Sequence, residues 1–307
     1  MMKISIIGAG NVGSLTAMRL AQAGLGDVVL IDILKDLAFG KSLDLEDARP
    51  ILSSHYNIEG SEDINKIKDS DIIVITAGMA RRPGMAREEL FSKNSQILKG
   101  VSLNIKSLAQ GAKVIVVTNP LDLMTILVLK VTGFKPNQVF GMGISLDAAR
   151  FANIIARELK LSVNDIEAMV IGAHGEAMLP LPSHSKVKGV SLNKVITGER
   201  VEQLVKETIG RGAEIVAALG TGSAFFAPSA AIARMAGMIV KDEKKIIGAC
   251  AYLDGEYGIK DICIGVPCRL GKQGIEKIIE LDLNKEEKKA FLKSANKLKE
   301  QYSSITI

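Results

Sequence analysis

The chain has 307 residues, of which 47% are hydrophobic, so it is long enough to form one large or two medium-sized domains. Lys and Arg exceed Asp and Glu by only five charges, and these are spread along the chain, which argues against nucleic acid or a membrane surface as a partner. The three cysteines lack CxxC spacing, which argues against a disulfide framework or a zinc site and favours the cytoplasm. We expect no membrane span and no signal peptide, because an apolar run of about 18 residues is missing.

The first half of the sequence alternates between apolar runs and helical patterns. Residues 3–8, KISIIG, are a β-branched run closed by glycine, and residues 12–23 follow with helical spacing before Gly24. Further runs begin at residues 28 (VVLI), 71 (DIIVITAG) and 113 (KVIVVTNP). Continuous apolar runs are typical of strands buried on both faces. The pattern therefore predicts an α/β protein whose N-terminal half is a Rossmann fold, a doubly wound parallel sheet.

The pattern changes past about residue 145. We expect a long helix over 146–159, strand-like segments around 168–171 and 186–190, and helices near 201–219 and 284–301. This predicts a dinucleotide-binding domain over residues 1–144 and a C-terminal α+β substrate domain over 145–307.

The ends of the first two apolar runs indicate a dinucleotide site. Gly8, Gly10 and Gly13 form a GxGxxG turn, which lets the backbone of a helix N-terminus approach a pyrophosphate. The turn alone could simply be tight. Asp32, nineteen residues after Gly13, ends the second run, where a carboxylate can accept both ribose hydroxyls. It would repel a 2′-phosphate, so the pair favours NAD over NADP; capping a helix is the alternative role for Asp32.

Two asparagines have two interpretations each. Asn94 falls within the apolar stripe of Leu90, Ile97, Val101, Ile105 and Leu108, and a buried amide needs partners. Asn119 follows the fourth apolar run, and Pro120 could fix its turn through a cis bond. Each asparagine is either a satisfied core residue or a contact to a bound cofactor.

The second half supplies candidates for proton transfer. Asp147 and Arg150 lie on one helical face with Ile154, so both charges point where the helix buries apolar groups. An intrahelical ion pair is the alternative explanation. His174 stands in a glycine turn, IGAHGEAM, directly after a strand-like run. A lone histidine is often structural, but one in such a turn beside a dinucleotide domain is a candidate proton carrier.

Seven motifs together resemble the lactate/malate dehydrogenase family, and within it the malate dehydrogenases of the lactate-dehydrogenase-like type. They are GAGNVG, LDLEDA, TAGMARRPGMAREEL, VVTNP, GISLDAARF, GAHGEAMLPL and GTGSAFFAP, in the family's order over nearly the full chain. The resemblance implies reversible NAD-dependent oxidation of (S)-malate to oxaloacetate, a step of the tricarboxylic acid cycle. It also implies a homodimer or homotetramer.

The resemblance assigns roles to individual residues. It makes His174 the acid/base, oriented by Asp147, and it places Arg150 on the 1-carboxylate of the substrate and Asn119 near the reacting oxygen. Arg81 would meet the distal carboxylate and Arg87 the C2 carbonyl; a planar guanidinium holds a carboxylate through two hydrogen bonds. The implied NAD contacts are Gly8, Gly10, Asn11, Val12, Gly13, Asp32, Asn94, Thr118 and Asn119. Where the family commonly has aspartate after HG, this chain has Glu176.

Three alternatives remain open to test. A lactate or other 2-hydroxyacid dehydrogenase would have glutamine or an apolar residue in place of Arg81. The NAD-dependent glycosidases share the fold but need a metal held by Cys and His, and no cysteine lies near His174 in the sequence. A catalytically silent NAD-binding protein would not need His174, Asp147 and Arg150 together.

Overall fold

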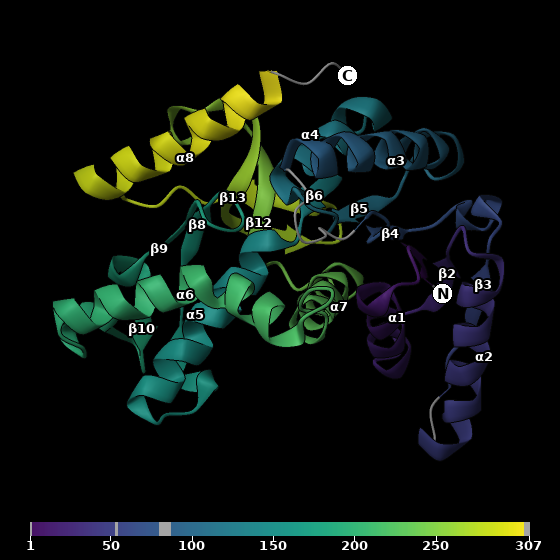
Figure 1. Ribbon diagram of the computed structural model, residues 1–307, viewed down its shortest axis with the longest axis horizontal. Helices are drawn as coiled ribbons and strands as arrows, with labels where there is room; N and C mark the ends of the chain where they lie inside the picture. The colour runs from purple at the N-terminus through teal and green to yellow at the C-terminus, as the bar shows by residue number, and fades with distance from the viewer. Residues whose placement is uncertain (1, 53–54, 80–86, 304–307) are drawn as a thin grey trace.

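The computed structural model describes residues 2–52, 55–79 and 87–303. One long sheet crosses the molecule, with strand order β3-β2-β1-β4-β5-β6-β12-β13-β8-β9 and β14 paired to β13 (Figure 1). The first six positions have the order of a doubly wound dinucleotide-binding fold. The expected α/β class is confirmed.

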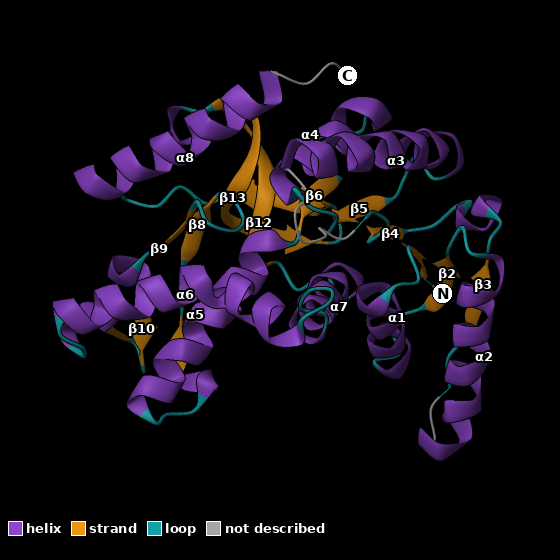
Figure 2. Cartoon of the chain, viewed as in Figure 1, coloured by secondary structure: helices purple, strands orange, loops and turns teal. Residues whose placement is uncertain are grey.

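The N-terminal part of the sheet is parallel throughout. Its strands are β1 (Lys3–Ile7), β2 (Asp27–Ile31), β3 (Ile58–Ser61), β4 (Ile72–Ile75), β5 (Lys113–Val116) and β6 (Val139–Gly141). The helices between them are α1 (Asn11–Gln22), α2 (Lys35–Leu52), α3 (Arg87–Leu108) and α4 (Leu121–Thr132). Figure 2 shows α3 and α4 on one side of the strands and α1 on the other, so both faces of the sheet are covered.

The C-terminal part continues the same sheet through antiparallel pairs, because β12 pairs with β6 and β13 pairs with β12 and β8. The long strands are β12 (Lys245–Asp254) and β13 (Lys260–Gly271), and the shorter ones are β8 (Val170–Gly172), β9 (Met178–Pro180) and β14 (Gly274–Ile278). A separate small sheet contains β7 (Ile166–Glu167), β10 (Lys186–Val187) and β11 (Val190–Ser191). The helices are α5 (Gly143–Leu159), α6 (Gly198–Leu219), α7 (Phe226–Val240) and α8 (Lys285–Ser303).

The predicted boundary near residue 144 falls beside the first residue of α5, Gly143. It stays a prediction. Within α3, the predicted apolar stripe is wrong at Ile97, which is 37% exposed, whereas its neighbour Leu98 is fully buried. Asn94 lies one helical turn before Leu98 and is fully buried. None of the described helices combines the length and apolar character needed to cross a membrane.

Because β1, β2, β4 and β5 are parallel, their carboxyl ends lie on the same side of the sheet. In an open α/β sheet, ligands bind beyond the carboxyl ends of the strands, where the strand order reverses. Here the order reverses between β1 and β4, and the segments that follow these strands contain most of the predicted site residues.

Candidate active site

The glycine turn after β1 depends on glycine at two of its three positions. Gly8 has a φ of +113°, and a Cβ on Gly13 would lie 1.8 Å from the carbonyl oxygen of Gly8. Gly10 differs, since a Cβ there would have no heavy atom within 4 Å. It is also the N-cap of α1 and has no side chain to accept the first N–H groups of the helix. The turn therefore leaves open space and unsatisfied donors at the start of α1, before Asn11, which suits an anion.

Asp32 lies against this turn. Its Oδ2 accepts a hydrogen bond from the N–H of Ala9 at 2.7 Å, and its Oδ1 accepts one from Leu34 at 3.0 Å. Each oxygen keeps a lone pair for a further donor. The side chain therefore both braces the glycine turn and presents a carboxylate at the end of β2.

Asn94 ties together the segments that follow β4 and β5. Its Oδ1 accepts from the N–H of Met79 at 2.8 Å, and its Nδ2 donates to the carbonyl oxygens of Asn119 at 2.7 Å and Met79 at 3.3 Å. Of the two interpretations, this geometry favours the satisfied core asparagine. Beside it, Thr118 donates from Oγ1 to the carbonyl of Ala77 at 2.6 Å. The Asn119–Pro120 bond is cis, as the sequence suggested.

His174, Asp147 and Arg150 come together. Asp147, fully buried on α5, lies with Oδ2 at 2.7 Å from Nδ1 of His174 and with Oδ1 at 3.1 Å from Nη1 of Arg150. The intrahelical ion pair is therefore present, but the carboxylate also holds the histidine. A Cβ on Gly143 would lie 2.9 Å from Cβ and Cγ of His174, so glycine at the start of α5 lets the ring approach.

This arrangement sets the protonation of His174. Its side chain is only 14% exposed, and burial alone lowers the pKa. Attraction to Asp147 and the hydrogen bond to it raise the pKa, and attraction to Asp122 raises it further, whereas repulsion from Arg150 lowers it. In sum, the pKa of His174 lies above its usual value of 6.5. Because Nδ1–H points to Asp147, the exchangeable position is Nε2, as a general acid/base requires.

Arg150 has capacity left for a ligand. Only Nη1 bonds to Asp147, and Nε is buried without a hydrogen-bond partner among the described residues. A buried, unpaired guanidinium N–H is costly unless another acceptor arrives. A carboxylate is the acceptor that matches the planar fork.

Two predicted substrate contacts, those of Arg81 and Arg87, fall outside what the structure describes. Arg81 lies outside the described residues, and so does the side chain of Arg87, whose backbone begins α3. Glu176 is exposed in the turn between β8 and β9.

Two family models together match almost the whole chain. The NAD-binding domain of lactate/malate dehydrogenase matches residues 2–141, and the α/β C-terminal domain of lactate/malate dehydrogenase matches residues 144–306. The chain belongs to the lactate/malate dehydrogenase family.

Relatives within this family share the whole length of the chain. A malate dehydrogenase of Methanosarcina barkeri is 48% identical over 307 residues, covering 100% of both chains. The crystal structure of Cryptosporidium parvum malate dehydrogenase has a TM-score of 0.96 at 37% identity, covering 99% of each chain. The lactate dehydrogenase of Cryptosporidium parvum, complexed with lactic acid and NAD, also has a TM-score of 0.96 at 37% identity, covering 99% of this chain and 97% of its own. The backbone therefore does not separate the two activities of the family.

Two charged residues of this chain contact the candidate site but were not predicted from the sequence. Lys41, on α2, donates from Nζ to the carbonyl oxygen of Ala9 at 2.6 Å and to Oγ of Ser14 at 2.9 Å. Asp122, on α4, accepts the backbone N–H of His174 on Oδ2 at 2.8 Å. Neither residue carried a sequence signal, because their partners Ala9 and His174 lie 32 and 52 residues away.

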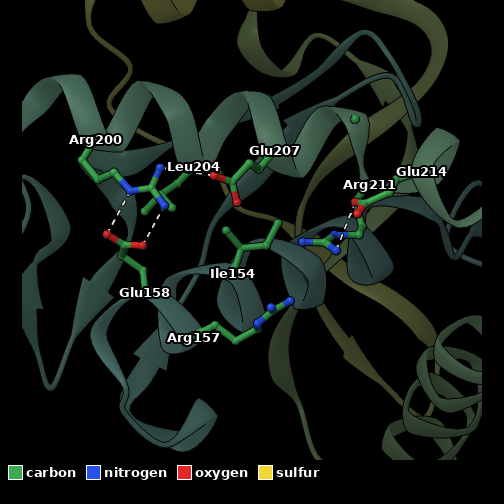
Figure 3. A pocket seen from close by; sticks show the side chains of 9 residues that line it. Ile154, Arg157, Glu158, Arg200, Leu204, Glu207, Arg211 and Glu214 are labelled. Carbon is green, nitrogen blue, oxygen red and sulfur yellow. Dashed lines mark hydrogen bonds and ion pairs between the residues drawn. The ribbon is translucent and has the colours of Figure 1, made fainter.

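A groove of about 590 Å³ between α5 and α6 is a separate feature (Figure 3). Its charges are largely paired within the groove: Arg200 with Glu158 at 2.7 Å, and Arg211 with Glu214 at 3.1 Å. The residues that line it are Ile154, Arg157, Glu158, Arg200, Leu204, Glu207, Gly210, Arg211 and Glu214. This set shares no member with the predicted site residues.

Proposed function

We propose that this chain is an NAD-dependent malate dehydrogenase that interconverts (S)-malate and oxaloacetate, the reaction of the tricarboxylic acid cycle. The observation that carries the proposal is the pair of contacts to Asp147, with His174 at 2.7 Å and Arg150 at 3.1 Å. One buried carboxylate thereby fixes a proton carrier and a carboxylate receptor side by side. The malate dehydrogenase relatives at 48% identity support the choice of substrate.

The glycine turn and its surroundings fit a dinucleotide. Asn11, Val12 and Gly13 at the start of α1 would present backbone N–H groups to the pyrophosphate. Gly8 and Gly10 would let the pyrophosphate approach the turn, where the N–H of Gly8 is already bonded to the carbonyl oxygen of Ile31. Asp32 would accept the ribose hydroxyls. Thr118 and Asn119 would line the nicotinamide side, with Asn94 placing the Asn119 loop. NAD, when bound, supplies the hydride acceptor for malate oxidation.

The residues of the chain supply the proton chemistry. In malate oxidation, neutral His174 takes the hydroxyl proton on Nε2, and Asp147 stabilises the resulting imidazolium. In oxaloacetate reduction, the imidazolium returns that proton to the developing alkoxide. Asn119 would lie near the reacting oxygen.

Three arginines would hold the substrate. Arg150 receives the 1-carboxylate, and its unpaired Nε supports this assignment. Arg81 would receive the distal carboxylate, and Arg87 would polarise the C2 carbonyl. Pyruvate lacks the distal carboxylate, so the identity of residue 81 is the feature that favours malate over lactate.

Absorbance of NADH in the presence of oxaloacetate tests the proposal. We expect the purified chain to oxidise NADH. Turnover should fall by several orders of magnitude in His174→Asn, whereas the affinity of this variant for NADH, measured by fluorescence titration, should be unchanged. Full activity in His174→Asn would remove the proton role from this residue.

We also propose a homodimer or homotetramer, which the resemblance implies, and a cytoplasmic location, which the cysteine usage implies. Exposed apolar side chains on α2, Phe39 and Leu43, support self-association. Sedimentation of the purified chain tests this, and a monomer at micromolar concentration would contradict it.

A further inference from the structure

The backbone of the His174 turn is held from two helices. Asp122, on α4, accepts the N–H of His174 at 2.8 Å. Ser294, on α8, accepts the N–H of Ala173 at 3.0 Å and donates to the carbonyl of Ala177 at 2.9 Å. The turn is therefore fixed on both sides of the histidine before any ligand arrives.

Asp122 is unusual because its side chain is a buried acid. It is 4% exposed in the first turn of α4. Its Oδ2 takes one neutral N–H, and its Oδ1 has no hydrogen bond of normal geometry among the described residues. An asparagine could accept the same N–H without the cost of burying a charge. An acid at this position therefore needs an explanation.

The groups around Asp122 indicate what that charge does. Burial raises the pKa of Asp122, and Asp147 raises it further, whereas His174 and the Cys250 thiol on β12 lower it. The N-terminal end of α4 also favours an anion at this position. On the other side, Asp122 raises the pKa of His174, while Arg150 lowers it. Asp122 and the imidazolium therefore stabilise each other, although no side-chain hydrogen bond joins them.

We propose that Asp122 is a positioning residue for proton transfer, whose carboxylate fixes the His174 turn and supplies a second negative charge beside the imidazolium. Asp147 contacts Nδ1 of the His174 ring, and Asp122 accepts the backbone N–H of the same residue. The inference rests on the proposed acid/base role of His174. It adds that this role depends on two carboxylates, which lie 25 residues apart in the sequence and on different helices.

Two substitutions separate the hydrogen bond from the charge. Asp122→Asn keeps an acceptor for the N–H of His174 and removes the charge, whereas Asp122→Ala removes both. Glu286→Gln is the matched control, because Glu286 is an exposed acid in the first turn of α8. The pKa of His174 is read from its ring signal in NMR titrations, with His174→Asn giving the assignment among the three histidines.

We expect Asp122→Asn to lower the pKa of His174 by roughly half a unit to one unit, with no fall in thermal stability, since a buried charge is relieved. The alkaline limb of kcat/KM for oxaloacetate should move by the same amount. Asp122→Ala should additionally lower turnover and thermal stability. Glu286→Gln should change neither the pKa of His174 nor the thermal stability. An unchanged His174 pKa in Asp122→Asn would overturn the inference. Because NMR titration needs no turnover, this result is distinct from a failure of the malate dehydrogenase activity itself.

Discussion

Asp147 Oδ2 lies 2.7 Å from Nδ1 of His174, and its other oxygen bonds to Arg150. One fully buried carboxylate thus organises two side chains that lie on either side of it. The His174 pKa is raised chiefly by this contact against the opposing effect of burial. The direction of that shift leads to predictions for both directions of the reaction.

The two directions should have opposite pH limbs. Malate oxidation needs neutral His174, so its kcat/KM should rise with pH through the raised pKa and level off above it. Oxaloacetate reduction needs the protonated form, so its kcat/KM should be full below the raised pKa and fall as pH rises through it. Both limbs should lie above pH 6.5, the ordinary value. Initial rates over a pH series check this, and parallel limbs would exclude a single shared acid/base.

Asp147→Asn should move both limbs toward acid. The variant loses the attraction and the charge-assisted hydrogen bond, and leaves burial as the main influence, which lowers the pKa of His174. Turnover should fall by about 10²–10⁴-fold, because the imidazolium loses its counter-charge. Binding of NADH, measured by fluorescence, should be unaffected. A limb that stays in place would show that Asp147 does not set the protonation of His174.

The glycine turn offers a matched pair of substitutions. Gly13→Ala places a Cβ 1.8 Å from the Gly8 carbonyl oxygen and should destabilise the fold by about 1–3 kcal/mol or more. Gly10→Ala meets no atom within 4 Å and should keep the melting temperature of the parent. Gly10→Ala should nevertheless weaken the binding of NADH, because the added methyl group fills the space where the pyrophosphate would lie. Equal NADH affinity for Gly10→Ala and the parent would place the dinucleotide elsewhere.

The choice between NADH and NADPH should depend on Asp32. Its carboxylate, held by Ala9 and Leu34, would repel a 2′-phosphate. The parent should therefore use NADH far better than NADPH, and Asp32→Ser should narrow the difference. The comparison requires kcat/KM for both cofactors with each protein. Equal use of both by the parent would contradict the assignment of Asp32.

Local sequence predicted the elements that position the site, but not those that complete it. Continuous apolar runs gave β1, β2, β4 and β5. The three-residue strand β6 is too short for a periodic signal. The helix α7 is largely buried, so it lacks the polar face that marks an amphipathic helix. The strands β12 and β13 were missed, because glycine, cysteine and proline interrupt their β-branched pattern.

The same limit applies to the site. His174, Asp147 and Arg150 were predictable because their motifs carry them, and Asp147 and Arg150 are three residues apart on one helix. The contacts of Asp122 with His174 and of Lys41 with Ala9 join residues 52 and 32 positions apart. Such contacts depend on tertiary packing. Ile97 was wrongly assigned to the buried stripe of α3, because that face of the helix contains its neighbour Leu98 instead.

Arg81 should select the substrate. A bidentate, charge-assisted contact in a closed site contributes about 1.5–3 kcal/mol, and an unpaired guanidinium facing the methyl group of pyruvate costs a similar amount. Arg81→Gln removes both effects, so kcat/KM for oxaloacetate should fall steeply and the preference over pyruvate should shrink or invert. Arg87→Gln should instead lower turnover on both substrates, because they share the C2 carbonyl. An unchanged preference in Arg81→Gln would show that another residue holds the distal carboxylate.

The most direct test of malate dehydrogenase activity is kcat/KM for oxaloacetate and for pyruvate, measured side by side with NADH on the unmodified chain. The two effects at Arg81 sum to about 3–6 kcal/mol, so we expect oxaloacetate to be favoured on the order of 10²–10⁴-fold. Equal values would contradict the account, and a preference for pyruvate would identify the chain as a lactate-type member of its family.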